Sequence, residues 1–417
     1  MNPQRTASRA RHALAALLLA ALLTALTPTP HANAQATLQP PDWVKPGMRL
    51  VYWTGTYTRQ SSGTVFVPDP EGPIKDDQGN RWRIVHRGAD RGGAELGPVA
   101  GMGYAVVDVV AVEGDRVVLD TRTLTVLNRR VHFTGRTATH HDLATGNGTW
   151  LDRDRLQRLQ AGQLLPGEAT GPYQLADGRP LPSVLFIRHT NTGHTIFDLA
   201  TGAQASDLTR ARVTPGKNAG PSGKLTDAKR ETVGLAYLKS LRPIDLPWTN
   251  GSPPDWVART PTLHYRGTRT VHTPGTPTIP QPTERLATLQ HAANTYTLHT
   301  ESSYDTLAGV RQLATTTPIA TGPASVGGYW IDPNALNRLE SNTRLDRDPV
   351  TGVTLSVGQA QRLPNGDTLL PIIEQGSHYQ NVFAYSTTTG VLATIHQTAH
   401  LATGTITANL TLQNPPR

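Results

Sequence analysis

The sequence predicts a mostly β fold made of two homologous antiparallel β domains, each with one short helix. The first observation behind this prediction is a pentapeptide, Pro-Pro-Asp-Trp-Val, which occurs at Pro40–Val44 and again at Pro253–Val257. The second is a series of segments rich in β-branched residues with partly alternating polarity, a pattern typical of half-buried strands. The third is a recurring turn signature, Asp-x-x-Thr-Gly. These patterns do not distinguish a sandwich, a closed barrel and a half-barrel.

Further blocks match in the same order after each pentapeptide. Trp53–Thr58 aligns with Tyr265–Thr270, and Trp150–Leu159 aligns with Trp330–Leu339. The distance between matching blocks exceeds the ~20–50 residues of a solenoid or propeller repeat. We therefore interpret the pattern as a duplicated domain and not as an array of short repeats.

The spacing between matched positions changes along the chain. It is 212 at Gly55 and Gly267 (267 − 55) but 179 at Leu119 and Leu298 (298 − 119), so the first copy carries 33 extra residues (212 − 179). The predicted organisation is a signal peptide at 1–34, a first β copy at 40–213 with an extra segment at about 60–103, a linker at 214–252 and a second β copy at 253–414.

Candidate strands are runs of β-branched and aromatic residues bounded by turn residues. Ala105–Val112 is continuously apolar and Arg116–Leu127 alternates, so the turn Glu113-Gly114-Asp115 between them predicts a hairpin. The other predicted strands, in chain order, are Arg49–Thr58, Arg81–His86, Val131–Arg136, Val184–His189, Ala287–Thr300, Thr368–Ile373 and Gly404–Leu412.

One short helix is predicted in each copy. In the second copy, Asp332 caps the helix and Pro333 occupies its first position; in the first copy, Asp152 repeats the cap. In the linker, a helix over Asp227–Leu241 is one interpretation, although Gly234 disfavours it.

The first 34 residues are predicted to be a secretory signal peptide. Its basic start precedes an apolar run of 14 residues, Ala13–Leu26, and small residues predict cleavage after Ala34 or alternatively after Ala36. The apolar run is shorter than the ~20 residues needed to cross a bilayer. We therefore expect a soluble periplasmic or extracellular protein with no transmembrane segment in the mature chain.

Composition excludes several function classes. The chain has no cysteine, which excludes disulfides, thiol catalysis and cysteine-ligated zinc. The formal net charge of +8 falls to +5 (8 − 3) without the three arginines of the signal peptide. Because the basic residues are scattered among acids, we expect no nucleic-acid partner.

No cofactor motif is complete. Gly220–Lys224 lacks the earlier glycine and the following Ser or Thr of a phosphate loop, and no Gly-x-Ser-x-Gly elbow occurs. His140 and His141 adjoin a predicted turn, and His396 and His400 lie in a predicted strand, where four residues span ~13 Å, too far for one metal ion. The sequence therefore predicts no cofactor and no metal site.

The extra segment of the first copy is the predicted place for ligand contacts. Tryptophans at duplicated positions, such as Trp150 and Trp330, are predicted to anchor the core or an interface. Trp82 instead lies in the unshared segment, and function concentrates on segments that a rigid scaffold holds. The predicted ligand-contact residues are Trp82, Arg81, Arg83 and His86.

Two functional hypotheses follow. The first is an exported, non-catalytic envelope or extracellular protein that binds a small molecule, a lipid-like ligand or an envelope protein. The second is a secreted glycan hydrolase that uses a pair of carboxylates, for which Glu71, Asp76, Asp77 and Glu95 are the candidates. A purely structural envelope component is the third alternative.

Overall fold

The computed structural model of the chain describes residues 39–60, 64–68, 71, 74–75, 81–87, 95–96, 101–163, 168–174, 180–186, 193–219, 225–249, 251–307 and 309–416. The predicted signal peptide, with both cleavage positions, lies outside these residues. The predicted fold class is confirmed in its main terms, because the described chain is mostly β, with antiparallel open sheets and three short α-helices.

The first large sheet is built from strands of the first half of the chain and from strands of the predicted linker. Its order is β8-β7-β6-β1-β13-β12-β11-β10-β9, with β5 paired to β1. The strands are β1 (Met48–Gln60), β5 (Glu95–Leu96), β6 (Gly101–Glu113), β7 (Arg116–Leu127), β8 (Arg130–Asp142), β9 (Glu168–Gln174), β10 (Pro180–Phe186), β11 (Gly193–Asp198), β12 (Gln204–Ala219) and β13 (Leu225–Pro243).

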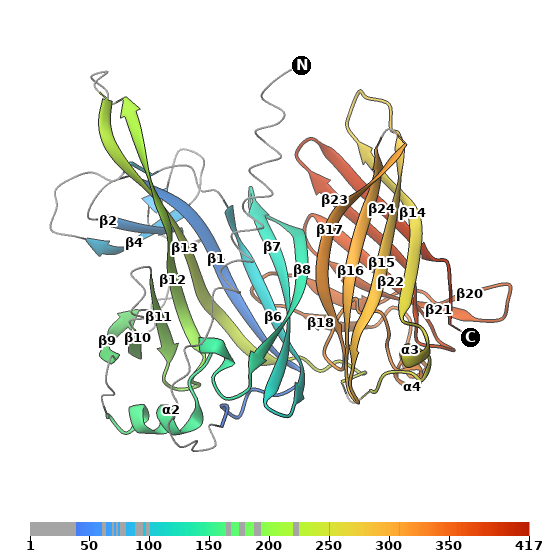
Figure 1. Cartoon of the computed structure of the whole chain (residues 1–417), viewed down its shortest axis with the longest axis horizontal. Helices are drawn as coiled ribbons and strands as arrows, with labels where there is room; N and C mark the ends of the chain where they lie inside the picture. Colours follow the sequence, from blue (N-terminus) through green and yellow to red (C-terminus); the bar gives the residue numbers. More distant parts are fainter. Residues whose placement is uncertain are drawn as a thin grey trace. The chain divides into compact units, whose positions relative to one another are not determined.

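The second large sheet comes from the second half of the chain alone, and Figure 1 shows its strands from β14 to β24. Its order is β17-β16-β15-β14-β24-β23-β22-β21-β19-β18, with β20 paired to β21. The strands are β14 (Thr262–His272), β15 (Pro280–Ala292), β16 (Thr297–Leu307), β17 (Val310–Thr321), β18 (Arg344–Arg347), β19 (Thr354–Val357), β20 (Gln361–Arg362), β21 (Thr368–Gln375), β22 (Tyr379–Ser386), β23 (Leu392–Leu401) and β24 (Gly404–Leu412).

A small third sheet and four helical turns complete the described elements. The small sheet has the order β2-β4-β3, from β2 (Thr64–Pro68), β3 (Ile74–Lys75) and β4 (Arg81–Arg87). The helices are a 3-10 turn, η1 (Gly146–Gly148), and α2 (Arg153–Gln160), α3 (Trp256–Arg259) and α4 (Pro333–Leu336).

The chain divides into two compact units, each built from more than one segment. Unit 1 contains residues 1–41, 52–104 and 144–239, and unit 2 contains residues 42–51, 105–143 and 240–417. Unit 2 therefore combines the whole second sheet with β7, β8 and the adjoining parts of β1 and β6.

Three predictions differ from the structure, and the first is the number of helices, because the second copy contains two short helices, α3 and α4, where one was predicted. The segment Asp227–Leu241, for which a helix was one interpretation, belongs to strand β13. Pairing with β12 along most of its length supplies backbone hydrogen bonds that outweigh its helical propensity. The strand predicted over Ala287–Thr300 is a hairpin, in which β15 and β16 are joined by a turn that Ala293 N closes on Tyr296 O at 2.9 Å.

The Asp-x-x-Thr-Gly signature forms the predicted hairpin turns at Asp198–Gly202 and Asp348–Gly352, whereas Asp142–Gly146 leads from β8 into the 3-10 turn η1 and not into a hairpin. Asp348 Oδ1 accepts hydrogen bonds from the backbone N–H of Val350 and Thr351, at 3.0 and 2.7 Å. Gly352 then takes a positive φ of 72°, which favours glycine at this position. Gly202 and Gly390 close the related turns with the same φ of 73°.

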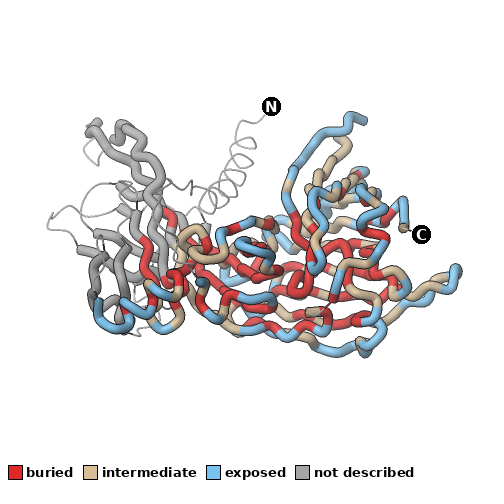
Figure 2. Tube along the Cα trace, turned by 60° about the horizontal axis from the view of Figure 1, so that its bottom comes forward, coloured by how far each residue is buried: buried red, intermediate tan, exposed pale blue. Residues whose placement is uncertain are grey.

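Strands of unit 2 supply many of its buried side chains. Figure 2 shows the buried segments in the middle of the chain trace and exposed segments at the hairpin tips. The predicted anchoring role of tryptophan agrees with the burial of Trp256 and Trp330, which are 5% and 3% exposed. Trp330 Nε1 donates to Thr297 Oγ1 at 2.8 Å, and Trp256 Nε1 donates to Thr389 O at 2.7 Å, so each indole keeps its polar group bonded.

The two Trp-x-Asp segments make equivalent backbone contacts in the two halves of the chain. Leu151 N donates to Gly202 O, and Ile331 N donates to Gly390 O, both at 2.9 Å. Asp152 and Asp332 each cap the helix that follows, α2 and α4. Two isolated bridges also correspond, Trp150 with Ala203 and Trp330 with Val391.

Candidate ligand pocket and buried ion network

A pocket of about 270 Å³ lies on one face of the second sheet, within unit 2. Seven consecutive strands of that sheet contribute to it, from β17 through β16, β15, β14, β24 and β23 to β22. Its polar lining comes from Arg269, Thr283, Glu284, Arg285, Ser303, Asp305, Asn381, Gln397 and Thr398, and its apolar lining from Phe133, Ala314, Tyr379, Ala399, Ile406, Ala408 and Leu410.

Strand register explains which side chains share the pocket face. Directly paired residues in antiparallel strands point to the same face, and Arg285 pairs with Ser303 on β16, whereas Gln397 pairs with Ala408 on β24 and with Asn381 on β22. Because side chains alternate along each strand, Ile406, Ala408 and Leu410 of β24 all face the pocket.

The second sheet curves around this pocket. Arg285 Nη2 donates to Gln397 Oε1 at 3.1 Å, although β14 and β24 separate their strands. In a flat sheet three strand spacings would hold these backbones about 14 Å apart, with parallel side chains. The contact therefore requires curvature toward the pocket face.

Gly267 on β14 allows the close approach that accompanies this curvature. A Cβ atom at this position would lie 1.7 Å from Asn409 O of the neighbouring strand β24. Only glycine permits β14 and β24 to come this close, and glycine in a strand often marks such an approach.

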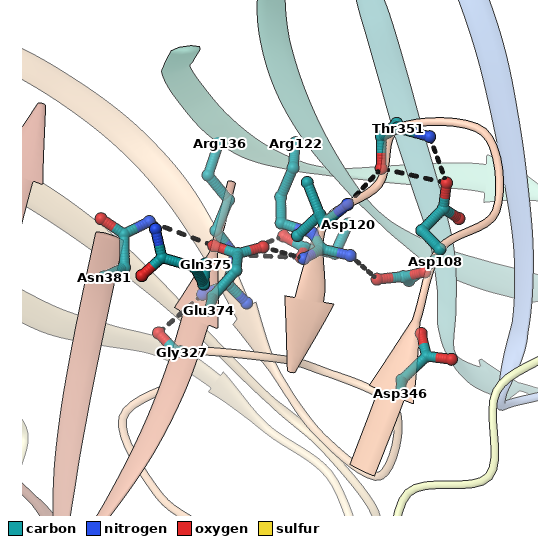
Figure 3. A network of polar contacts seen from close by, with 12 residues as sticks. Asp108, Asp120, Arg122, Arg136, Gly327, Asp346, Thr351, Glu374, Gln375 and Asn381 are labelled. Atoms are coloured by element: carbon teal, nitrogen blue, oxygen red, sulfur yellow. Dashed lines mark hydrogen bonds and ion pairs between the residues drawn. The ribbon is translucent and has the colours of Figure 1, made fainter. Parts of the chain in front are cut away.

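A row of polar contacts leads from the pocket into the interior. Gln397 Nε2 donates to Asn381 Oδ1 at 3.3 Å, and Asn381 Nδ2 donates to Glu374 Oε2 at 3.0 Å. Glu374, which is 3% exposed, forms an ion pair with Arg122. The row thus connects Arg285 on β15 with Arg122 on β7, as Figure 3 shows for its inner part.

The row continues into a buried ion network. Arg122 Nη2 donates to Asp108 Oδ2 at 2.9 Å, and Arg49 Nε donates to Asp108 Oδ1 at 2.6 Å. Arg49 Nη1 also donates to Asp346 Oδ2 at 3.0 Å, and Arg242 Nη2 donates to the same carboxylate oxygen at 2.8 Å. Buried charges are tolerated only when they are paired and hydrogen-bonded, and the buried Arg49, Asp108 and Arg122 meet that condition, while Asp346 and Arg242 are partly exposed.

Two carboxylates of the network have opposite pKa shifts. Burial alone would raise the pKa of Asp108, but the charges and hydrogen bonds of Arg49 and Arg122 outweigh it and hold that pKa below its usual value. Burial raises the pKa of Asp120, because Arg136 offsets only part of the desolvation cost. Arg136 also donates to two backbone carbonyls, Gly327 O at 2.7 Å and Ala320 O of β17 at 2.9 Å, as Figure 3 shows for the first.

The opposite end of the polar row is held by Glu301 on β16. Glu301 Oε1 lies 3.4 Å from Arg285 Nε, and its other oxygen accepts a hydrogen bond from Tyr329. His299, two residues earlier on the same face, packs its ring 4.9 Å from that of Tyr329. Burial lowers the pKa of His299 to about 4, so its ring is neutral at pH 7.

Three histidine rings lie near one another in unit 2, from β8, from the turn between β21 and β22, and from β23. The rings of His132 and His378 are 5.4 Å apart, and those of His378 and His400 are 6.3 Å apart. Even so, in the part of the chain that the structure describes, no group of three His, Asp or Glu side chains is arranged to hold a metal ion. His396 and His400 bond instead to side chains of β24, Asn409 and Thr405.

The residues predicted from sequence to contact a ligand lie elsewhere. Trp82, Arg81, Arg83 and His86 all belong to β4, where Trp82 pairs with Pro68 and with Ile74 in the small sheet. Their role as ligand contacts stays a prediction. Of the carboxylates considered for hydrolysis, Glu71 is an exposed turn residue and Glu95 begins β5, while Asp76 and Asp77 lie outside the described residues.

The pocket residues were missed because they are spread over distant strands. Arg285 and Gln397 are 112 positions apart, and each occurs in an ordinary strand pattern. One available signal was the presence of charged residues at strand positions whose neighbours two residues away are apolar, as at Arg285 before Ala287. A charge on the inward face of a strand marks a buried ion pair or a binding site.

The comparisons with known proteins leave the family open. No protein-family model and no curated protein matches the sequence. Among solved structures, the chain is similar to a protein of unknown function from the DUF3598 family of Nostoc punctiforme, with 11% identity over 87% of this chain and 95% of that chain and a TM-score of 0.15. A superposition at that TM-score does not establish a common fold.

None of the helices among the described residues is both long enough and apolar enough to span a membrane.

Proposed function

We propose that this protein is an exported, non-catalytic binding protein that holds a small ligand in the pocket of the second sheet. The observation that carries the proposal is the pocket itself, where seven strands direct side chains into one space of about 270 Å³. Ligand sites combine an apolar lining with a few placed polar groups, and this lining has both. Export rests on the predicted signal peptide of residues 1–34.

The size and polarity of the pocket favour a small ligand over a lipid. Its volume lies just below the ~300 Å³ at which typical ligand pockets begin. Arg269 and Arg285 both line it, and a long acyl chain would have to desolvate these guanidinium groups without compensation. The lipid-like ligand considered from the sequence therefore fits this pocket less well than a small amphipathic molecule does.

The internal duplication supports a scaffold role for the rest of the chain. We propose that the two halves descend from one domain, because the matched segments at Leu151 and Ile331 make equivalent hydrogen bonds. In that arrangement the contacts shared by both halves maintain the fold, and the contacts found in one half alone are the candidates for binding. We assign the pocket to the second group, since most of its lining comes from strands of the second half, with Phe133 of β8 contributed by the first half.

Native mass spectrometry of protein purified from its own cell envelope tests the proposal. We expect the wild-type protein to carry a bound small molecule, and Ala408→Trp, which fills the pocket from β24, to lose it. The matched control is Thr411→Trp, an exposed position three residues further along the same strand and on its other face. A wild-type protein found only at its bare mass would refute the proposal, and retention of the ligand by Ala408→Trp would place the site elsewhere.

A further inference from the structure

We infer that the pocket takes a small monocarboxylate, with its carboxylate at β14–β16 and its apolar body along β22–β24. This inference rests on the proposed function and adds the chemical class and the orientation of the ligand. It is carried by the separation of polar and apolar groups along the sheet and by the unused hydrogen-bond donors at the polar end.

The two ends of the pocket differ in chemistry. Three neighbouring strands, β14 to β16, supply its charged groups and most of its hydroxyl groups, which are Arg269, Thr283, Glu284, Arg285, Ser303 and Asp305, while the hydroxyl of Thr398 comes from β23. The next three strands, β24 to β22, supply Ile406, Ala408, Leu410, Ala399 and Tyr379, and Phe133 of β8 packs its ring 5.8 Å from that of Tyr379. The amides on these strands, Asn381 and Gln397, already donate and accept within the polar row. A ligand that satisfies both ends must therefore be amphipathic.

The polar end offers more donors than the protein uses. Arg285 donates from Nη2 to Gln397, and its buried Nε lies 3.4 Å from Glu301 without a hydrogen bond. Arg269 donates from Nη1 to Asp305 at 3.2 Å, which leaves Nη2 and Nε for other acceptors. A guanidinium group carries five N–H donors, so two guanidinium groups with these few contacts select a ligand that accepts several hydrogen bonds.

A carboxylate fits this requirement better than a neutral or a doubly charged group. Its two oxygens accept up to four hydrogen bonds and pair with guanidinium in a bidentate manner. An amide or alcohol accepts fewer, and a phosphate dianion would place a second negative charge beside Asp305 and Glu301, which already accompany the two arginines. Because a liquid water occupies about 30 Å³, the pocket holds roughly nine non-hydrogen atoms, which matches a six-carbon acid.

The experiment compares hexanoate with hexanamide and hexan-1-ol, three probes of nearly equal size, by NMR titration at pH 7. We expect hexanoate to bind at least tenfold more tightly than either neutral probe. Arg285→Gln is expected to weaken hexanoate binding at least tenfold, and Arg285→Lys, which keeps the charge but loses the planar fork, to weaken it by a smaller factor. The control is Arg362→Gln, at an exposed position on β20 that does not line the pocket, which should bind as the wild type does.

The outcomes separate this inference from the proposed function. The carboxylate class is overturned if hexanamide binds as tightly as hexanoate. It is also overturned if folded Arg285→Gln and Arg285→Lys bind hexanoate as the wild type does. In either case the proposed function stands if Ala408→Trp still blocks binding of the neutral probes. Absence of binding by all three probes also overturns the inference. If native mass spectrometry then shows a bound molecule of another chemical class, the proposed function is retained. If it shows only the bare protein, the inference and the proposed function are both refuted.

Discussion

His299 makes the stability of unit 2 sensitive to mild acid. The side chain is 1% exposed on β16, and burial lowers its pKa to about 4 from the 6.5 expected in the unfolded chain. The unfolded state therefore binds a proton first as the pH falls, so the stability contributed by neutral, folded His299 is fully present above pH 6.5 and is lost between pH 6.5 and about 4.

The size of the effect follows from the two pKa values. The interval from 6.5 to about 4 corresponds to about 3 kcal/mol in total, at ~1.36 kcal/mol per pH unit. Between pH 7 and pH 5, protonation of the unfolded state accounts for about 2 kcal/mol of that loss. This window lies above the range in which most carboxylates titrate, so His299 can be observed separately from Asp108 and its neighbours.

Urea denaturation at pH 7, 6 and 5 measures the prediction. The pKa values of His132, His140 and His378 are also lowered, so the quantity to compare is the difference between wild-type protein and His299→Gln, which cannot be protonated. We expect the free energy of unfolding of the wild type to fall about 2 kcal/mol more than that of His299→Gln between pH 7 and pH 5. His272→Gln, at an exposed position on β14, is the matched control and should follow the wild type. Parallel pH dependence of wild type and His299→Gln would refute the reasoning.

Two further substitutions test the ion network and the curvature of the sheet. Arg122→Met leaves Glu374 buried without its cation and should lower the free energy of unfolding, measured in urea, by about 3–5 kcal/mol. Adding Glu374→Gln should restore part of the lost stability. No recovery in the double variant would contradict the pairing of Arg122 with Glu374. Gly267→Ala places a Cβ atom against Asn409 O and should lower the free energy of unfolding by about 3 kcal/mol or more. The control, Gly135→Ala on β8, has no atom within 4 Å of its added Cβ and should change that free energy by under ~1 kcal/mol. Equal effects of the two substitutions would contradict the close approach of β14 and β24.

Local chemistry made much of the fold predictable. The turn at Glu113–Asp115 and the strand Gly404–Leu412 were predictable because hydrophobic alternation and a glycine with positive φ both act over a few residues. The helix caps at Asp152 and Asp332 were predictable for the same reason, since each side-chain oxygen bonds a backbone N–H two or three residues away.

The pocket and the ion network could not be predicted in this way. The ion pair between Arg122 and Glu374 joins residues 252 positions apart, and it exists only because β7 and β21 belong to one compact unit. A sequence shows that a charge lies in an apolar strand, but it does not show which of many opposite charges the fold brings to it. The same limit explains why Asp227–Leu241 was ambiguous, because the partner strand β12, and not the local sequence, decides its structure.

The proposed duplication offers an explanation of why the pocket lies in the second half. On the offset of 179 established at Leu298, Glu301 corresponds to Arg122 (301 − 179 = 122) and His299 corresponds to Asp120 (299 − 179 = 120). Equivalent positions of the two sheets thus carry different charges: Arg122 neutralises Asp108 and Glu374 in the interior, whereas Glu301 holds Arg285 beside the pocket. On the proposed function and duplication, divergence at matched strand positions accounts for a binding site in one copy without an inserted segment. The unshared segment at about 60–103 then becomes a second, independent place for function, which a variant such as Trp82→Ala can test separately from the pocket.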